Sequence, residues 1–156
     1  EQITLEVVAS LGGNNTGLVV GNLENGGYAI EYHTTTGVFA FQVSVNGTYI
    51  VDAITDPYGI DPNSINKMYY MSGSYDNAKA IFYQNGAKYE VTAAGTIAKP
   101  QENSTMMIGV NPKGSNPAQD YFVGKVYTVR IYNRALSEDE IMHNYQVDKR
   151  RYQMFE

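Results

Sequence analysis

Short apolar runs, separated by clusters of Gly, Asn and Pro, follow one another along nearly the whole chain. The clearest run is VFAFQVSVNG at residues 38–47, where Phe39, Phe41, Val43 and Val45 alternate with smaller or polar residues. A period of two places the apolar side chains on one face of a half-buried β-strand. Further apolar runs lie at residues 3–10, 17–21, 26–33, 67–76, 79–91, 104–110 and 121–133. The pattern predicts an all-β fold, an antiparallel β-sandwich of short strands.

The segments between these runs carry recognisable turn signals. Asn46-Gly47 and Asn85-Gly86 each stand between two apolar runs and predict tight hairpins. Residues 55–66, with two Asp-Pro pairs, and residues 111–120, with two Pro, predict polar loops. Gly124 interrupts the last apolar run and predicts a β-bulge.

One helix is predicted, and it lies at the C-terminal end of the chain. Ser137 followed three residues later by Glu140 forms a capping box, the usual start of a helix. Ile141 and Tyr145 are spaced to lie on one helical face. We therefore expect a short C-terminal helix that packs on the core and closes one end or edge of the sandwich.

Composition narrows the class of protein. A length of 156 residues favours a single domain, residues 1–156. The net charge of −5 and the absence of a basic stripe argue against nucleic acid as a partner. No apolar stretch is long enough for membrane insertion, and the lack of Cys excludes disulfides and thiolate metal sites. The chain enters its first strand almost at once after Glu1, so we expect a domain excised from a longer polypeptide, whose other domains are further partners.

The order of the segments is familiar as well. ITLEVVAS, GGYAIEYH, MYYMSGSYDNAKAIFYQNGAKY, MMIGVN and YFVGKVYTVRIYNRALSEDEI together resemble the laminin G-like, concanavalin A-like jelly-roll domains. In that family a strand ending in Tyr-Asp precedes an Asn-Gly hairpin, as Tyr75-Asp76 precedes residues 82–86 here. The closing motif, residues 129–137, is the most specific part of the resemblance. Two departures are Met68, where the family has Trp, and the missing or truncated first strand, which would leave a sheet edge uncovered.

The resemblance implies a concanavalin A-like jelly roll of a kind appended to exported enzymes, adhesins and surface or virion-tail proteins. Such domains bind glycans or proteins, and many bind Ca²⁺. Our expectation is a non-catalytic carbohydrate-binding module, extracellular or at the cell surface, with a glycan or polysaccharide as its partner. The alternative is a structural or protein-interaction spacer domain without a glycan ligand. A glycoside hydrolase is a third reading, because the fold also hosts hydrolases and does not by itself decide function.

The hydrolase reading requires a pair of carboxyl groups, about 5–5.5 Å apart in retaining enzymes. Glu138 and Glu140 belong to the start of the predicted helix, and Glu6 has no acidic partner two or four residues further on. His33 and His143, the two histidines, show no spacing typical of a catalytic triad or a metal site. The sequence therefore does not predict an enzyme.

Polar residues on three predicted strands are the candidate glycan site, because they face away from the apolar row of their own strand. If the strands are neighbours in one sheet, these side chains form a polar concave face that carries a tyrosine. An ordinary solvated sheet face would show the same pattern. The candidates are Glu31, His33, Gln42, Ser44, Asn46, Tyr70, Ser72 and Ser74.

Oxygen-rich side chains in the predicted loops and turns are candidates for calcium, which prefers several hard oxygen ligands. Asp, Asn, Pro and Gly also make turns without any metal, so turn formation is the competing interpretation. The candidates are Asp56, Asp61, Asp76, Asn111 and Asp120.

Overall fold

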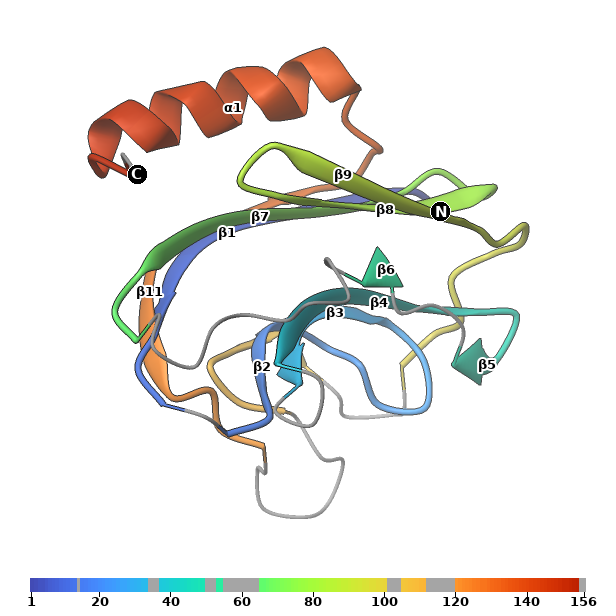
Figure 1. Ribbon diagram of the computed structural model, residues 1–156. Helices are drawn as coiled ribbons and strands as arrows, with labels where there is room; N and C mark the ends of the chain where they lie inside the picture. Colours follow the sequence, from blue (N-terminus) through green and yellow to red (C-terminus); the bar gives the residue numbers. More distant parts are fainter. Residues whose placement is uncertain are drawn as a thin grey trace.

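Two antiparallel sheets form a sandwich in the computed structural model, with one helix outside it (Figure 1). The structure describes residues 1–13, 15–33, 37–49, 53–54, 65–100, 105–111 and 120–154. The strands are β1 (Ile3–Leu11), β2 (Gly17–Gly21), β3 (Tyr28–His33), β4 (Val38–Val45), β5 (Thr48–Tyr49), β6 (Ala53–Ile54), β7 (Met68–Tyr75), β8 (Lys79–Gln84), β9 (Ala87–Thr92), β10 (Met107–Ile108) and β11 (Gly124–Tyr132), and the helix is α1 (Glu138–Arg151). Sheet A has the strand order β11-β1-β7-β8-β9, and sheet B has the order β10-β2-β3-β4-β5 with β6 also paired to β4. The predicted all-β sandwich is confirmed.

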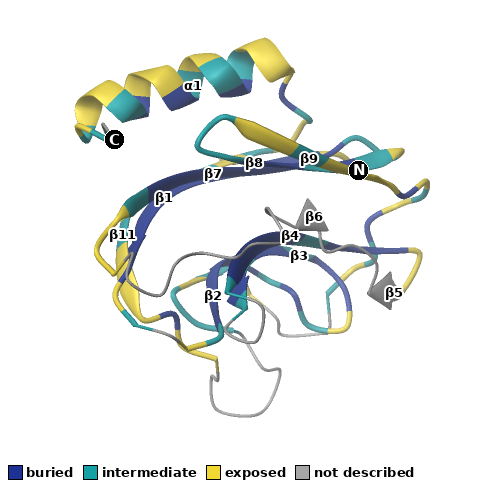
Figure 2. Ribbon diagram, in the orientation of Figure 1, coloured by how far each residue is buried: buried dark blue, intermediate teal, exposed yellow. Residues whose placement is uncertain are grey.

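The space between the sheets is filled by the apolar faces that the alternation predicts. Phe39, Phe41, Val43 and Val45 of β4 all lie in this core, and Figure 2 shows the buried strands facing each other. Gly73 on β7 makes room for Phe41, since a Cβ at Gly73 would lie 2.2 Å from the Phe41 ring. The two sheets therefore pack closely at this position, where a larger residue has no space.

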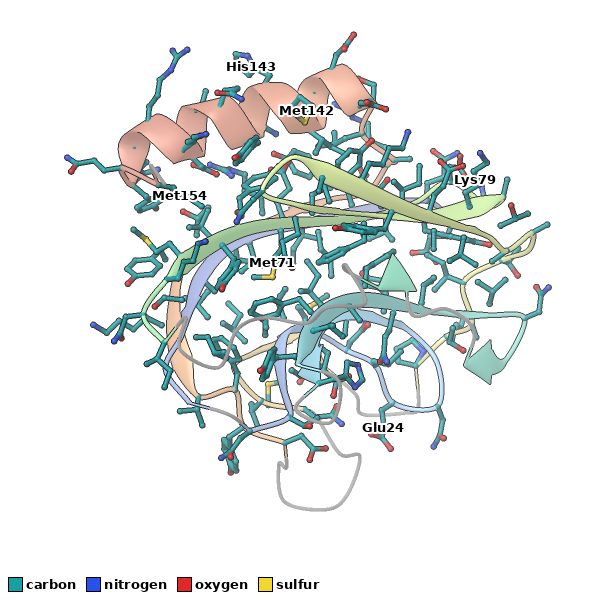
Figure 3. The ribbon with its side chains drawn as sticks, in the orientation of Figure 1. Glu24, Met71, Lys79, Met142, His143 and Met154 are labelled. Atoms are coloured by element: carbon teal, nitrogen blue, oxygen red, sulfur yellow. The ribbon has the colours of Figure 1, made fainter. Side chains whose placement is uncertain are left out.

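Helix α1 lies across the outer face of sheet A rather than at an end of the sandwich (Figure 1). The expected capping box is present, with the Glu140 N–H donating to Ser137 Oγ and the Ser137 N–H donating to Glu140 Oε2. Ile141 and Tyr145 pack with Val8 and other side chains of sheet A in a second apolar cluster. His143 lies on the exposed side of the helix, whereas Met142 lies toward the sheet (Figure 3). The helix position corrects our expectation, because a sheet face with apolar outward side chains needs a cover.

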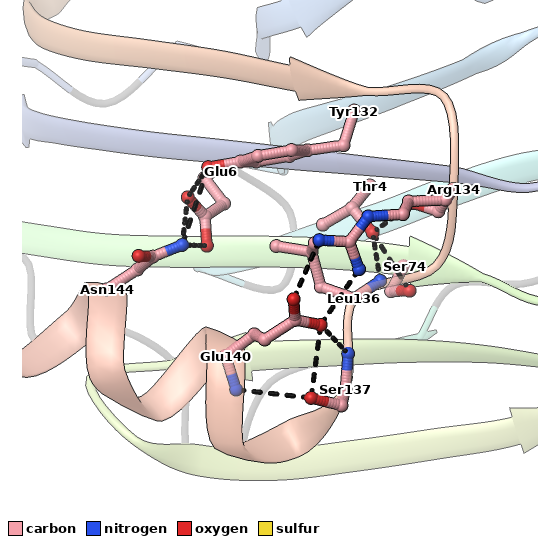
Figure 4. A network of polar contacts seen from close by, with 9 residues as sticks. All are labelled: Thr4, Glu6, Ser74, Tyr132, Arg134, Leu136, Ser137, Glu140 and Asn144. Carbon is pink, nitrogen blue, oxygen red and sulfur yellow. Dashed lines mark hydrogen bonds and ion pairs between the residues drawn. The ribbon is translucent and has the colours of Figure 1, made fainter.

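A buried polar network joins α1 to sheet A around Glu6 (Figure 4). The Glu6 carboxylate is fully buried and accepts hydrogen bonds from the Tyr70 hydroxyl at 2.7 Å and from Asn144 Nδ2 at 3.0 Å. Arg130 pairs bidentately with Asp148 at 2.6 and 2.9 Å and lies 3.5 Å from Glu6. A buried carboxylate is tolerated only when it is hydrogen-bonded or paired. Burial raises the pKa of the Tyr70 hydroxyl far above its ordinary value of 10.0, so it remains a hydrogen-bond donor.

Strand β11 is the edge of sheet A within the described part of the chain, and its pairing with β1 is irregular near its middle. The register shifts between Val8 and Ala9, which leaves Tyr127 unpaired, so the predicted bulge at Gly124 is wrong in position. Gly124 has a different role, because a Cβ there would lie 2.2 Å from the Ser10 carbonyl oxygen. Tyr152, just after α1, contacts the Tyr127 ring at 5.7 Å. The C-terminal end of the helix thus covers part of the outer face of β11.

Candidate functional site

Three of the predicted glycan-binding residues come together on the outer face of sheet B. Glu31 and His33 are on β3, and Gln42 is on the neighbouring strand β4. Gln42 Nε2 lies 3.2 Å from His33 Nε2, which is itself 3.9 Å from Glu31 Oε2. The alternation of β3 and β4 produces this arrangement, because the flanking residues Tyr32 and Phe41 point into the core.

The cluster is partly exposed and contains three kinds of polar group. The side chain of His33 is 29% exposed and that of Glu31 is 16% exposed. The amide nitrogen of Gln42 is a donor, so His33 Nε2 accepts this hydrogen bond when the ring is neutral. A protonated ring would instead direct its N–H toward Glu31. The cluster therefore offers a carboxylate acceptor, an amide and an imidazole, the groups that bind hydroxyls.

An exposed tyrosine that sequence reasoning missed lies on the same face. Leu18 of β2 pairs with Glu31 on one side and forms a parallel bridge with Tyr121 on the other. Residues paired directly across strands have side chains on the same face, so Tyr121 shares the face of Glu31. At about 4.8 Å between strands, Tyr121 and Glu31 are ~10 Å apart along this row. Tyr121 is 61% exposed, which leaves its ring open to a ligand.

The local sequence explains how Tyr121 reaches this position. Phe122, the next residue, belongs to the core, so Tyr121 must point outward. The segment passes so close to β2 that a Cβ at Gly17 would lie 2.5 Å from the Phe122 backbone nitrogen. The adjacent aromatic pair was the signal in the sequence, because alternation allows only one of the two rings to be buried.

Small apolar side chains lie between Tyr121 and the polar cluster, and they are buried. Leu18 and Ala29 pack together with Leu23, and Ala40 lies opposite Glu31 in the register of β3 and β4. The groups that this face exposes are therefore the Tyr121 ring at one side and the polar cluster at the other.

Ser44 and Asn46 belong to β4 and its hairpin turn, but their surroundings give them a mainly structural place. Ser44 is buried. Asn46 has a left-handed backbone, as the Asn-Gly turn requires, and its Oδ1 accepts a hydrogen bond from the Thr96 N–H at 3.1 Å. The Asn46 side chain therefore holds residues 94–96 against the turn.

The prediction is wrong for the third strand. Tyr70, Ser72 and Ser74 lie on β7, which belongs to sheet A and not to the sheet of β3 and β4. All three are buried on the face that α1 and the residues before it cover, and Ser74 contacts Thr4 at 3.2 Å. Polar and apolar residues alternate on β7 as they do on a strand with one face in water. In this structure, however, α1 covers that face.

The proposed calcium ligands do not form one site in the described part of the chain. Asp56 and Asp61 lie outside the described residues. Asp76 shapes a turn, since its Oδ1 accepts hydrogen bonds from the N–H groups of Ala78 and Lys79 at 2.8 and 2.7 Å. Asn111 and Asp120 stand at the two ends of the undescribed stretch 112–119. No group of three His, Asp or Glu that could hold a metal occurs among the described residues, so calcium binding stays a prediction.

Two pockets flank α1 on the opposite side of the molecule. One of about 200 Å³ is lined by residues that include Met68, Tyr145 and Lys149. Another of about 410 Å³ is lined by residues that include Tyr132, Arg134 and His143. Both belong to the groove between the helix and sheet A, and neither includes the polar cluster of sheet B.

Comparison with known proteins now identifies the family. The sequence profile of the concanavalin A-like lectin/glucanases superfamily matches residues 3–142. The chain belongs to this superfamily. The family and fold expected from the closing motif are therefore confirmed. No curated protein sequence matches the chain.

Solved structures share the superfamily fold at low sequence identity. The CBM40 module of the Ruminococcus gnavus IT-sialidase, bound to α2,3-sialyllactose, has a TM-score of 0.68 and 15% identity over 93% of this chain and 83% of its own. Domain 4 of the GH43 extracellular arabinanase of Geobacillus stearothermophilus, in complex with arabinotriose, has a TM-score of 0.65 and 17% identity over 91% of this chain and 65% of its own. The receptor binding domain of botulinum neurotoxin type G has a TM-score of 0.69 and 13% identity, and the match covers 94% of this chain but only 38% of the toxin domain. The lectin-like fold is thus common to carbohydrate-binding modules and to this chain.

A last structural observation concerns membranes. The described residues contain no helix that is both long and apolar enough to cross a bilayer.

Proposed function

We propose that this protein is a non-catalytic carbohydrate-binding module whose ligand lies on the outer face of sheet B. The observation that carries the proposal is the row of Tyr121, Leu18 and Glu31, with His33 and Gln42 beside it. An exposed aromatic ring offers a platform for the apolar face of a sugar, and the polar cluster offers partners for its hydroxyls. The sialyllactose and arabinotriose complexes of fold neighbours support the choice of ligand class.

The arrangement of carboxylates supports a binding role over hydrolysis. Glu31 is the acidic residue on strands β2, β3 and β4, and those strands supply no second carboxylate beside it. Glu6 and Asp148 do lie on either side of Arg130, but both are fully buried beneath α1 and engaged in its polar network. A retaining hydrolase needs two carboxyl groups that reach the substrate. The geometry therefore supports a binding module rather than an enzyme.

The biological setting is part of the same proposal. We place the module in an exported or surface protein, where it would bring its neighbouring domains to a polysaccharide. Domain 4 of the extracellular arabinanase is a solved example of a module within a larger protein. Calcium remains a separate proposal, with Asp56, Asp61, Asn111 and Asp120 as the ligands to test.

A glycan array, probed with and without EDTA, tests the proposal. We expect binding to at least one glycan class and a clear loss in the variants Tyr121→Ala and Gln42→Ala. Tyr127→Ala is the control, because it removes another exposed tyrosine ring on the opposite sheet, 43% exposed against 61% for Tyr121. Loss of binding in EDTA would support a calcium-assisted site. A chain that is folded by circular dichroism yet binds no glycan would refute the proposal and favour the spacer function.

A further inference from the structure

The charges of the sequence are divided unequally between the segments that contain the strands of the two sheets. The segments that contain the strands of sheet A and α1 are residues 1–11, 67–93 and 124–156, and they hold nine basic and nine acidic residues. The segments that contain the strands of sheet B are residues 12–66 and 94–123, and they hold seven acidic residues but only Lys99 and Lys113 as basic ones. The whole net charge of −5 therefore belongs to the sheet B segments. Figure 3 shows Glu24 on the side of sheet B and Lys79 on the side of sheet A.

The strands of the candidate site also have an acidic residue but no basic one. Strands β2, β3, β4 and β10 contain no Lys or Arg. Residues 120–123, around Tyr121, contain none either. Glu31 stands in the row that leads to Tyr121 and is largely shielded from water, with 16% of its side chain exposed. A partly desolvated carboxylate is screened less than one in water, so it repels a second anion more strongly.

Cationic groups favour the recognition of an anionic sugar. Carboxylates are held best by Arg, whose guanidinium forms two parallel hydrogen bonds, or by Lys as a point charge. The Arg residues of this chain lie on β11, just after it and on α1 (Arg130, Arg134, Arg150 and Arg151), all on the opposite sheet or its helix. A neutral sugar, in contrast, carries no charge that Glu31 would repel, and its hydroxyls can donate hydrogen bonds to a carboxylate.

We infer that the sheet B site takes uncharged glycans and discriminates against sialylated or uronate-containing ones. This inference rests on the proposed function and specifies its ligand class. It separates the chain from its fold neighbour that binds sialyllactose and places it with the neighbour that binds arabinotriose, a neutral sugar. Two domains with the same fold would thus differ in whether they bind charged or uncharged glycans.

The test compares matched glycan pairs, such as lactose oligomers with and without terminal sialic acid and arabinan oligomers against oligogalacturonate. We expect the neutral member of a pair to bind at least about tenfold more tightly, and the ratio to shrink as NaCl is raised. Glu31→Gln should narrow the ratio further, whatever its effect on affinity for the neutral glycan. Asp139→Asn, an equal change of net charge on α1, is the control and should leave the ratio unchanged.

Each outcome separates the two proposals. Equal or tighter binding of the anionic members would overturn the charge selection while leaving the carbohydrate-binding function intact. A ratio that does not respond to Glu31→Gln would also overturn it, because the discrimination would then not come from this carboxylate. Binding to no glycan at all would refute the proposed function itself.

Discussion

Removing the hydroxyl of Tyr70 tests whether β7 belongs to the sheet that α1 covers. Tyr70 looks like a solvent-facing strand residue in the sequence, but its ring packs 5.3 Å from Tyr145 and its hydroxyl donates to Glu6 at 2.7 Å. The same hydroxyl lies 3.2 Å from the Ile141 carbonyl oxygen in α1. Tyr70→Phe keeps the ring and removes the donor that links sheet A to the helix.

The expected cost follows from the partners that remain. Glu6 keeps its hydrogen bonds from Asn144 and Tyr132, so the carboxylate is not left without partners. The variant therefore loses one hydrogen bond to a charged acceptor, about 1.5–3 kcal/mol of the free energy of unfolding. For a chain of this length such a loss lowers Tm by about 3–12 °C.

Urea unfolding followed by circular dichroism measures this change as a shift of the midpoint with an unchanged slope. Ser72→Ala is the matched control, since Ser72 is buried on the same strand and its Oγ has no hydrogen-bond partner. We expect the control to be nearly neutral and Tyr70→Phe to leave glycan affinity unchanged. A loss below about 0.5 kcal/mol, or a weaker glycan affinity at unchanged stability, would refute the placement of Tyr70 beneath α1.

Three further predictions concern the core, the helix start and the site. Gly73→Ala should destabilise the fold by about 1–3 kcal/mol, because the added Cβ meets the Phe41 ring. Adding Phe41→Leu should recover part of the lost unfolding free energy. Additive effects of the two substitutions would argue against the contact. The Arg134 guanidinium lowers the pKa of the Glu140 carboxyl from its ordinary 4.5 to about 2, so the stabilisation is complete above pH 4.5 and is lost as the pH falls toward 2. The difference in unfolding free energy between the wild type and Glu140→Gln should therefore shrink over that pH range, and a constant difference would contradict the ion pair. Tyr121→Ala should weaken glycan binding by about 1–2 kcal/mol in titration calorimetry, roughly five- to thirtyfold in Kd, with stability changed by less than about 0.5 kcal/mol; unchanged affinity would move the ligand away from this ring.

Local features of the fold were predictable from the sequence. The alternation at residues 38–45 assigned Phe41 to the core and Gln42 to the outer face, and the structure agrees. The Asn46-Gly47 turn and the capping box of Ser137 and Glu140 were equally readable. Each depends on backbone geometry within a few residues, so the local sequence determines it.

The candidate site was only partly predictable. The prediction joined Gln42 with Tyr70 because both face away from the core on alternating strands, yet the two strands belong to different sheets. It missed Tyr121, which shares a face with Glu31 only through the pairing of both with Leu18. A strand shows which of its residues share a face but not which strand lies beside it, because pairing depends on contacts between distant parts of the chain.

The environment of each face was likewise decided by tertiary structure. Glu6 and Glu31 look alike in the sequence, because each is the one acidic residue of a strand in which polar and apolar residues alternate. Glu6 is buried because α1, more than 130 residues further along the chain, covers its face and supplies Asn144 as a partner. Glu31 faces outward from sheet B and keeps 16% of its side chain exposed. The sequence alone thus determined the strands, their faces and the family, whereas long-range packing decided which polar face became part of the interior and which one stayed at the surface.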